Sequence, residues 1–107
     1  MAKCVGSTGR RRNPLADPRA YGAPMELGDL QSRMAATYGE RDRARGVPAT
    51  VAWLTEELGE LAQAVRKGTA DDQLHELGDV LAWLASLANQ LGLSLEDAAD
   101  RYVTDPP

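Results

Sequence analysis

The stretch from residue 51 to residue 79, VAWLTEELGELAQAVRKGTADDQLHELGD, decides the fold. Its apolar residues recur at intervals of three and four, which is typical of two helices separated by a short turn. Each predicted helix carries a pair of acids spaced three residues apart: Glu57 with Glu60, and Glu76 with Asp79. Residues at this spacing lie side by side on one face of a helix. The stretch therefore predicts two adjacent helices that present four carboxylates.

The four carboxylates indicate a metal site, because acids on two packed helices repel one another unless a cation lies between them. Every candidate ligand is an oxygen, and no cysteine or histidine falls at a matching position. An all-oxygen set favours a hard divalent cation, Mg²⁺ with Mn²⁺ as a substitute, over zinc or copper. The alternative is a solvated helix face, but both pairs flank an apolar seam rather than lie opposite it. The predicted metal ligands are Glu57, Glu60, Glu76 and Asp79.

One glutamate, two glycines and the lone histidine lie next to these acids in the sequence. Glu56 projects further round the helix, so it is either a base that orients or deprotonates a water or a spectator. Gly59 and Gly78 lie in mid-helix, where glycine costs about 1 kcal/mol relative to alanine. We therefore expect a close backbone approach at both glycines. His75, the lone histidine, is expected at the surface, and it does not fit the Glu-x-x-His pattern of the di-iron carboxylate bundles.

Apolar periodicity predicts helices along most of the chain and no strand, because no stretch alternates apolar and polar residues with a period of two. Thr50 is the expected N-cap of the second helix, after a break at residues 46–48, and Ser94 is the expected N-cap of the fourth. The four helices are expected at about residues 26–43, 51–67, 70–91 and 95–101. The fold is therefore all-α, with three longer helices and a short C-terminal helix.

The apolar seams of the second and third helices are expected to pack against each other as a close pair. Both seams follow a spacing of three and four residues. The seam residues are Val51, Leu54, Leu58, Leu61 and Val65 in the second helix, and Leu74, Leu77, Leu81, Leu84, Ala88 and Leu91 in the third.

The distribution of charge divides the chain into an arm and a body. Residues 1–24 carry five basic and one acidic side chain without an apolar period, whereas residues 25–107 carry seven basic and fifteen acidic side chains. We expect a disordered basic N-terminal arm followed by one domain. The acidic domain does not suit specific nucleic-acid binding, and no apolar run is long enough for a membrane span. The one cysteine, Cys4, lies in the arm, so a disulfide framework is excluded and a cytoplasmic location is expected.

Five further side chains are candidates for binding substrate. Trp53 and Trp83 each share a helical stripe with the acids, so they either pack in the core or stack on a nucleobase. Asn89 is a polar candidate on the third helix. Arg45 and Lys67 either contact phosphates or act only as charged helix ends.

These residues together resemble a known family. The motif EExxE at residues 56–60, followed by ExxD at residues 76–79, is similar to the signature of the MazG-type all-α nucleoside triphosphate pyrophosphohydrolases. Further segments similar to the short stand-alone MazG-like proteins are residues 38–46, 50–54, 79–84 and 86–92. The resemblance covers about residues 25–102.

The resemblance implies a four-helix bundle that assembles as a homodimer or homotetramer. It also implies Mg²⁺-dependent hydrolysis of nucleoside triphosphates between the α- and β-phosphates, with a nucleoside monophosphate and pyrophosphate as products, in the housecleaning of nucleotide pools. The family's metal positions fall on the four predicted ligands, and its first motif glutamate falls on Glu56. A hypothesis from another class is a non-catalytic, metal-binding helical interaction module, and an assay of pyrophosphate release distinguishes the two.

Overall fold

The computed structural model describes residues 24–107, so the predicted arm, apart from Pro24, lies outside the described residues. The described part consists of four helices and contains no strand. They are α1 (Leu27–Arg45), α2 (Val47–Lys67), α3 (Ala70–Leu91) and α4 (Leu95–Thr104). The prediction of an all-α fold with three longer helices and a short fourth is confirmed.

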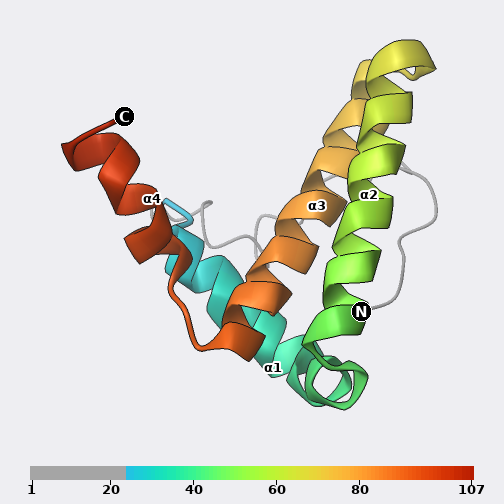
Figure 1. Ribbon diagram of the computed structural model, residues 1–107. Helices are drawn as coiled ribbons and strands as arrows, with labels where there is room; N and C mark the ends of the chain where they lie inside the picture. The colour runs from blue at the N-terminus through green and yellow to red at the C-terminus, as the bar shows by residue number, and fades with distance from the viewer. Residues whose placement is uncertain (1–23) are drawn as a thin grey trace.

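The second and third helices form an antiparallel hairpin, and α1 crosses the end of the hairpin that lies far from its connecting turn (Figure 1). The first helix packs chiefly on α3, and α4 packs chiefly on α1. The half of the hairpin near its turn therefore extends beyond α1 (Figure 1). None of the described helices is long and apolar enough to cross a membrane.

Gln31 of α1 joins three elements through hydrogen bonds. Its Nε2 donates to Asn89 Oδ1 at 3.1 Å and to Leu93 O at 2.9 Å. Leu95 N, at the start of α4, donates to Gln31 Oε1 at 2.8 Å. In return, Asn89 Nδ2 donates to Gln31 O at 2.9 Å. These bonds fix the start of α4 and the end of α3 against α1.

The start of the second helix differs from the prediction. The helix begins at Val47, and Pro48 lies in its first turn, where the missing N–H of proline has no intrahelical partner to lose. The interruption between α1 and α2 is therefore Gly46 alone, whose φ of 85° favours glycine. Thr50 is not the N-cap: it is buried inside α2, and its Oγ1 donates to Gly46 O at 3.0 Å. Ser94 caps α4 as predicted.

The second and third helices pack as a close pair, as predicted, but most residues of the leucine seams are exposed, so the predicted surface of contact was wrong. Leu58, Leu74 and Leu77 are 49%, 70% and 54% exposed. We call the exposed valines and leucines of the hairpin the outer face; they are Val51, Leu58, Val65, Leu74, Leu77, Leu81, Leu84 and Leu91. Apolar residues spaced three and four apart show that one stripe of a helix is apolar. They do not show whether that stripe packs against the same chain or against another molecule.

The hairpin instead packs through a more polar inner face, which consists of Thr50, Glu57, Glu60, Ala64, Glu76, Asp79, Trp83, Ser86 and Gln90. All of these side chains are buried or half-buried, and the buried polar ones include Thr50, Glu57 and Ser86. The close approach expected at Gly59 and Gly78 is absent within the described chain, because a Cβ added at either position meets nothing within 4 Å. Both glycines are exposed.

Candidate metal centre

The hairpin brings acids from α2 and α3 together. Glu57, Glu60 and Glu76 each offer a carboxylate oxygen, and these three atoms lie within 4.8 Å of one another. The connecting turn explains the convergence: Glu60 and Glu76 each lie eight residues from Gly68, and residues at equal distances from the turn of an antiparallel hairpin lie opposite each other. Glu57 and Asp79 each lie eleven residues from Gly68. Three of the four predicted metal ligands thus form one cluster.

Burial of these acids is unusual for charged side chains. Glu57 is 0% exposed, whereas glutamate is almost never fully buried unless it is paired or binds a metal. Two further oxygens, Glu76 Oε2 and Asp79 Oδ2, are buried and accept no hydrogen bond from the described residues. Buried carboxylate oxygens without donors leave lone pairs available to a cation. The residues present therefore fit a divalent ion.

The pKa of Glu76 is raised by its burial and by the neighbouring acids. Burial raises the pKa of its carboxyl above the ordinary value, and the nearby charges of Glu60 and Asp79 raise it further. A hydrogen bond with Glu60 acts in the same direction, because only the protonated form can donate it. His75 partly opposes the rise in pKa. Without a cation, the surroundings of the Glu76 carboxyl therefore favour its protonated form.

The fourth predicted ligand, Asp79, belongs to a second set with His75 and Glu76, whose ligand atoms also lie within 4.8 Å of one another. His75 Nε2 lies 3.5 Å from Asp79 Oδ2, and the two side chains are only 17% and 13% exposed. The expectation that His75 is a surface residue was therefore wrong. Its position four residues before Asp79 is the signal that could have placed it, since i, i+4 side chains meet on a helix.

Glu56, the predicted catalytic base, lies on a different side of α2 from its neighbour Glu57. Glu56 is exposed, whereas Glu57 is fully buried. The structure thus separates the two glutamates of the motif into one buried residue and one that solvent reaches. The role of Glu56 as a base remains a prediction.

An aromatic pair connects the hairpin to α1. The rings of Trp53 and Trp83 stack with centroids 5.6 Å apart and planes 6° apart. The Arg45 guanidinium lies 4.7 Å from the centroid of Trp83, and its Nη1 donates to Asp42 Oδ1 at 2.8 Å. Trp83 is 1% exposed and Trp53 is 38% exposed. The structure thus brings three predicted substrate residues together, and of the two rings only that of Trp53 has substantial solvent-accessible surface.

The other two predicted substrate residues lie elsewhere. Lys67 is the exposed last residue of α2, ten residues from Glu57, a distance of about 15 Å along the helix axis. Asn89 lies six residues beyond Trp83 on α3, about 9 Å along the helix axis. The oxygen and the nitrogen of its side-chain amide both form hydrogen bonds with Gln31. Neither joins the cluster around the tryptophans, and their contacts with substrate remain untested predictions.

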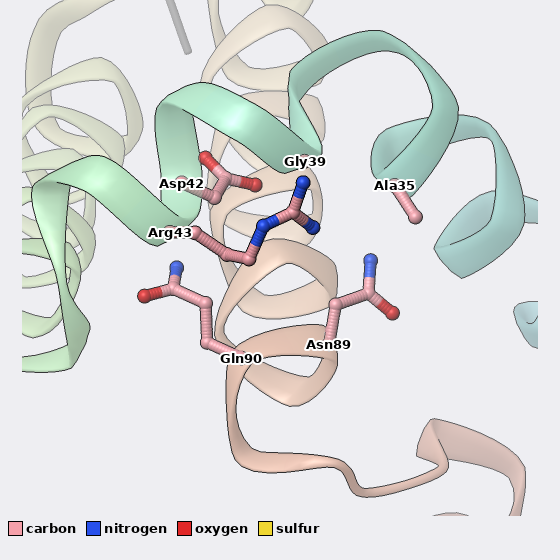
Figure 2. Close-up of a pocket in the computed structure, with 6 residues that line it drawn as sticks. All are labelled: Ala35, Gly39, Asp42, Arg43, Asn89 and Gln90. Carbon is pink, nitrogen blue, oxygen red and sulfur yellow. The ribbon is translucent and has the colours of Figure 1, made fainter.

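A cavity of about 300 Å³ lies between α1 and the end of α3 (Figure 2). Figure 2 shows Asp42 and Arg43 of α1 above Asn89 and Gln90 of α3. The lining residues are Ala35, Gly39, Asp42, Arg43, Asn89 and Gln90. The Gln90 side chain donates from Nε2 to Thr50 Oγ1 at 2.8 Å, while its Oε1 is buried and accepts no hydrogen bond from residues 24–107. Sequence reasoning did not anticipate this cavity.

The fold and the site define an all-α protein with paired acidic motifs in one helical hairpin. Residues 45–104 match the family model of the MazG nucleotide pyrophosphohydrolase domain. The chain is 43% identical to YpjD of Bacillus subtilis (strain 168) over 86 residues, which cover 70% of this chain and 78% of that protein. It is 34% identical to YvdC of the same organism over 90 residues, which cover 68% of this chain and 85% of that protein. Both relatives are described as uncharacterized.

The chain belongs to the MazG nucleotide pyrophosphohydrolase domain family. The resemblance noted in the sequence is thereby confirmed.

Proposed function

We propose that this protein is a Mg²⁺-dependent pyrophosphohydrolase that converts nucleoside triphosphates, NTP or dNTP, into a nucleoside monophosphate and pyrophosphate. Membership of the MazG family supports the class of reaction. The observation that carries the proposal is the convergence of Glu57, Glu60 and Glu76, with Glu57 completely buried. An acidic site of this kind can receive a polyanionic triphosphate only when bound cations reverse its charge.

Glu57, Glu60 and Glu76 would hold the cation, with Asp79 beside Glu76. The bound ion, Mg²⁺ or Mn²⁺ as a substitute, would neutralise phosphate charge and lower the pKa of a bound water. The carboxylates contribute by being positioned before substrate arrives, because helix packing fixes them on two neighbouring helices. We further propose that exposed Glu56 orients the attacking water and accepts its proton.

Trp53 is the proposed platform for the nucleobase. It shares a helical stripe with Glu57 and Glu60, and it retains exposed ring surface, whereas Trp83 is covered. Trp83 and Arg45 would then act by holding the Trp53 ring in place, through the stack and the cation–π contact. An aromatic face accepts any base, so this platform alone does not select among bases.

We also propose that the protein forms a homo-oligomer, either a homodimer or a homotetramer, through the outer face of the hairpin. Eight apolar side chains of α2 and α3 are exposed there, more than a small monomeric domain usually leaves uncovered. The mid-helix glycines support this, because Gly59 and Gly78 have open space around them into which a second chain can pack. A second copy carries the same apolar surface and is therefore a self-complementary cover.

An assay of pyrophosphate release with a panel of NTPs and dNTPs, with and without Mg²⁺, tests the activity. We expect turnover with Mg²⁺, no turnover in the presence of a chelator, and equal amounts of monophosphate and pyrophosphate. The absence of turnover with every triphosphate, in a protein that still binds Mg²⁺, would favour the non-catalytic helical module instead. Production of diphosphate and orthophosphate would contradict the proposed cleavage position.

A further inference from the structure

His75 gives one edge of the acidic cluster a nitrogen donor. It lies in the second turn of α3, immediately before Glu76 and four residues before Asp79. Its ligand atom lies within 4.8 Å of a carboxylate oxygen of both acids. The side chain is largely buried, and its Nε2 is 3.5 Å from Asp79 Oδ2, farther than a usual hydrogen bond. The imidazole is thus directed at the acids of the cluster.

Two sets of ligands, rather than one, emerge from these distances. One consists of Glu57, Glu60 and Glu76, the other of His75, Glu76 and Asp79, and Glu76 is common to both. Glu76 links the two sets, and we interpret them as two adjacent positions that share its carboxylate.

The chemistry of the two positions differs. The first offers only carboxylate oxygens, which suit Mg²⁺. The second combines imidazole nitrogen with carboxylate oxygen, and nitrogen donors favour first-row transition ions such as Mn²⁺, Co²⁺ and Zn²⁺ over Mg²⁺. Both acids of this set have a buried oxygen, Glu76 Oε2 and Asp79 Oδ2, that accepts no hydrogen bond from the described residues, and His75 Nε2 lies 3.5 Å from Asp79 Oδ2.

The helix also holds the second set in place. All three residues belong to α3, so their spacing does not depend on how the helices move against each other. The first turn of α3 is fixed by a capping box, in which Thr69 Oγ1 accepts from Asp72 N and Asp72 Oδ2 accepts from Thr69 N at 2.9 Å. Side chains four residues apart on a helix can both reach one ion without a change of backbone.

We propose that His75, Glu76 and Asp79 form a second cation position that takes a first-row transition ion, next to the all-oxygen position of Glu57, Glu60 and Glu76. This inference rests on the metal centre proposed above. It makes His75 a determinant of which divalent ions the protein binds, a role that the acidic motifs alone do not include.

Calorimetric titration of the wild-type protein with Mg²⁺ and with Co²⁺ tests the proposal, using His75→Gln and His75→Ala as variants. We expect the wild type to bind more Co²⁺ than Mg²⁺ per chain. Both variants should lose the additional Co²⁺ site or bind it about tenfold more weakly, and should keep their Mg²⁺ affinity within about twofold. Glu40→Gln, an exposed change on α1, is the matched control and should leave both titrations unchanged.

Pulsed electron paramagnetic resonance of the Mn²⁺-loaded protein provides a readout that a merely structural histidine would not give. We expect a nitrogen coupling from imidazole in the wild type and its loss in His75→Gln, with unchanged helical circular dichroism. A Co²⁺ site that survives in His75→Gln, or Mn²⁺ spectra without nitrogen coupling, would overturn the second position while leaving the Mg²⁺ centre intact. A wild type that binds neither Mg²⁺ nor Co²⁺ would overturn the centre as a whole.

Discussion

The inner and outer faces of the α2–α3 hairpin reverse the usual pattern of a soluble helical protein. Toward the interior lie Glu57, which is 0% exposed, and half-buried Glu60, Glu76 and Asp79. Toward solvent lie leucines such as Leu74, which is 70% exposed. A monomer optimised only for its own stability would exchange the two faces, because buried acids cost free energy and exposed leucines gain none.

The difference between the two faces supports the proposals that a cation binds at the inner face and that a second chain covers the outer face. Buried carboxylates are stabilised when a cation binds between them, and an apolar stripe is stabilised when a second apolar surface covers it. The two completions are independent, because they lie on different sides of the same helices. Variants directed at one face should therefore leave the property of the other face unchanged.

The largest effect is expected from changes at the inner face. Glu57→Gln and Glu76→Gln should each lower Mg²⁺-dependent pyrophosphate release by about a thousandfold, an effect of the size seen when a preorganised electrostatic group is removed. Their helical signal and oligomeric mass should match those of the wild type, because removing a buried charge relieves repulsion. Exposed Glu40→Gln should keep full activity. Turnover near the wild-type rate in Glu57→Gln would show that this acid is not part of the centre.

At the outer face, the double variant Leu77→Glu with Leu81→Glu should convert the proposed oligomer into a monomer. Each buried leucine contributes about 1.5–3 kcal/mol, and the new charges would repel across the interface. Because both leucines are already exposed within the single chain, circular dichroism should show that the helices persist. Light scattering provides the mass. An unchanged mass for this variant, or a monomeric wild type at micromolar concentration, contradicts the proposed interface.

At the edge of the inner face, Arg45→Met should lower the free energy of unfolding by about 3 kcal/mol, because it removes the ion pair between Arg45 and the buried Asp42 carboxylate. It also removes the cation–π contact with Trp83. Arg43→Met, at an exposed position on the same helix, should change stability by less than about 0.5 kcal/mol. Urea unfolding measures both. Equal effects of the two variants would mean that the contacts of Arg45 contribute little.

The smallest effect concerns the pH dependence of stability. The pKa of Glu76 is raised in the folded state, so the folded protein binds more protons than the unfolded one between the two pKa values. The raised pKa therefore stabilises the folded state at pH values below the pKa that Glu76 has in the unfolded chain. This stabilisation is lost as the pH rises through the pKa that Glu76 has in the folded protein. Glu76→Gln should remove this part of the pH dependence and make the metal-depleted protein slightly more stable at neutral pH. Parallel curves of melting temperature against pH for the two proteins would contradict the assignment.

The four helices and the convergence of the acids follow from local sequence. Glu60 and Glu76 lie at equal distances from Gly68, as do Glu57 and Asp79, so a hairpin with a turn at that glycine places them opposite each other. Helix boundaries were predicted well where a capping side chain sets them, as at Ser94. The error at Thr50 arose because a threonine in the first turn can bond back to a carbonyl as readily as cap a helix.

The direction of burial could not be predicted from the same pattern. Leu58 and Glu57 are neighbours on α2, so the sequence pattern allows either the leucine stripe or the glutamate stripe to face α3. The prediction placed the leucine stripe there because it is apolar. That choice assumes that the chain buries its own apolar surface, an assumption that fails when another molecule covers it. His75 was missed for a related reason: a lone histidine gives a weak signal until its spacing from Asp79 is considered.

Anomalous diffraction from crystals containing Mn²⁺ would show whether the inner-face carboxylates bind a divalent cation. We expect an anomalous peak within bonding distance of Glu57, Glu60 and Glu76, the three acids whose oxygens already lie within 4.8 Å of one another. A map in which manganese occupies only exposed acids, with no peak between α2 and α3, would contradict this expectation.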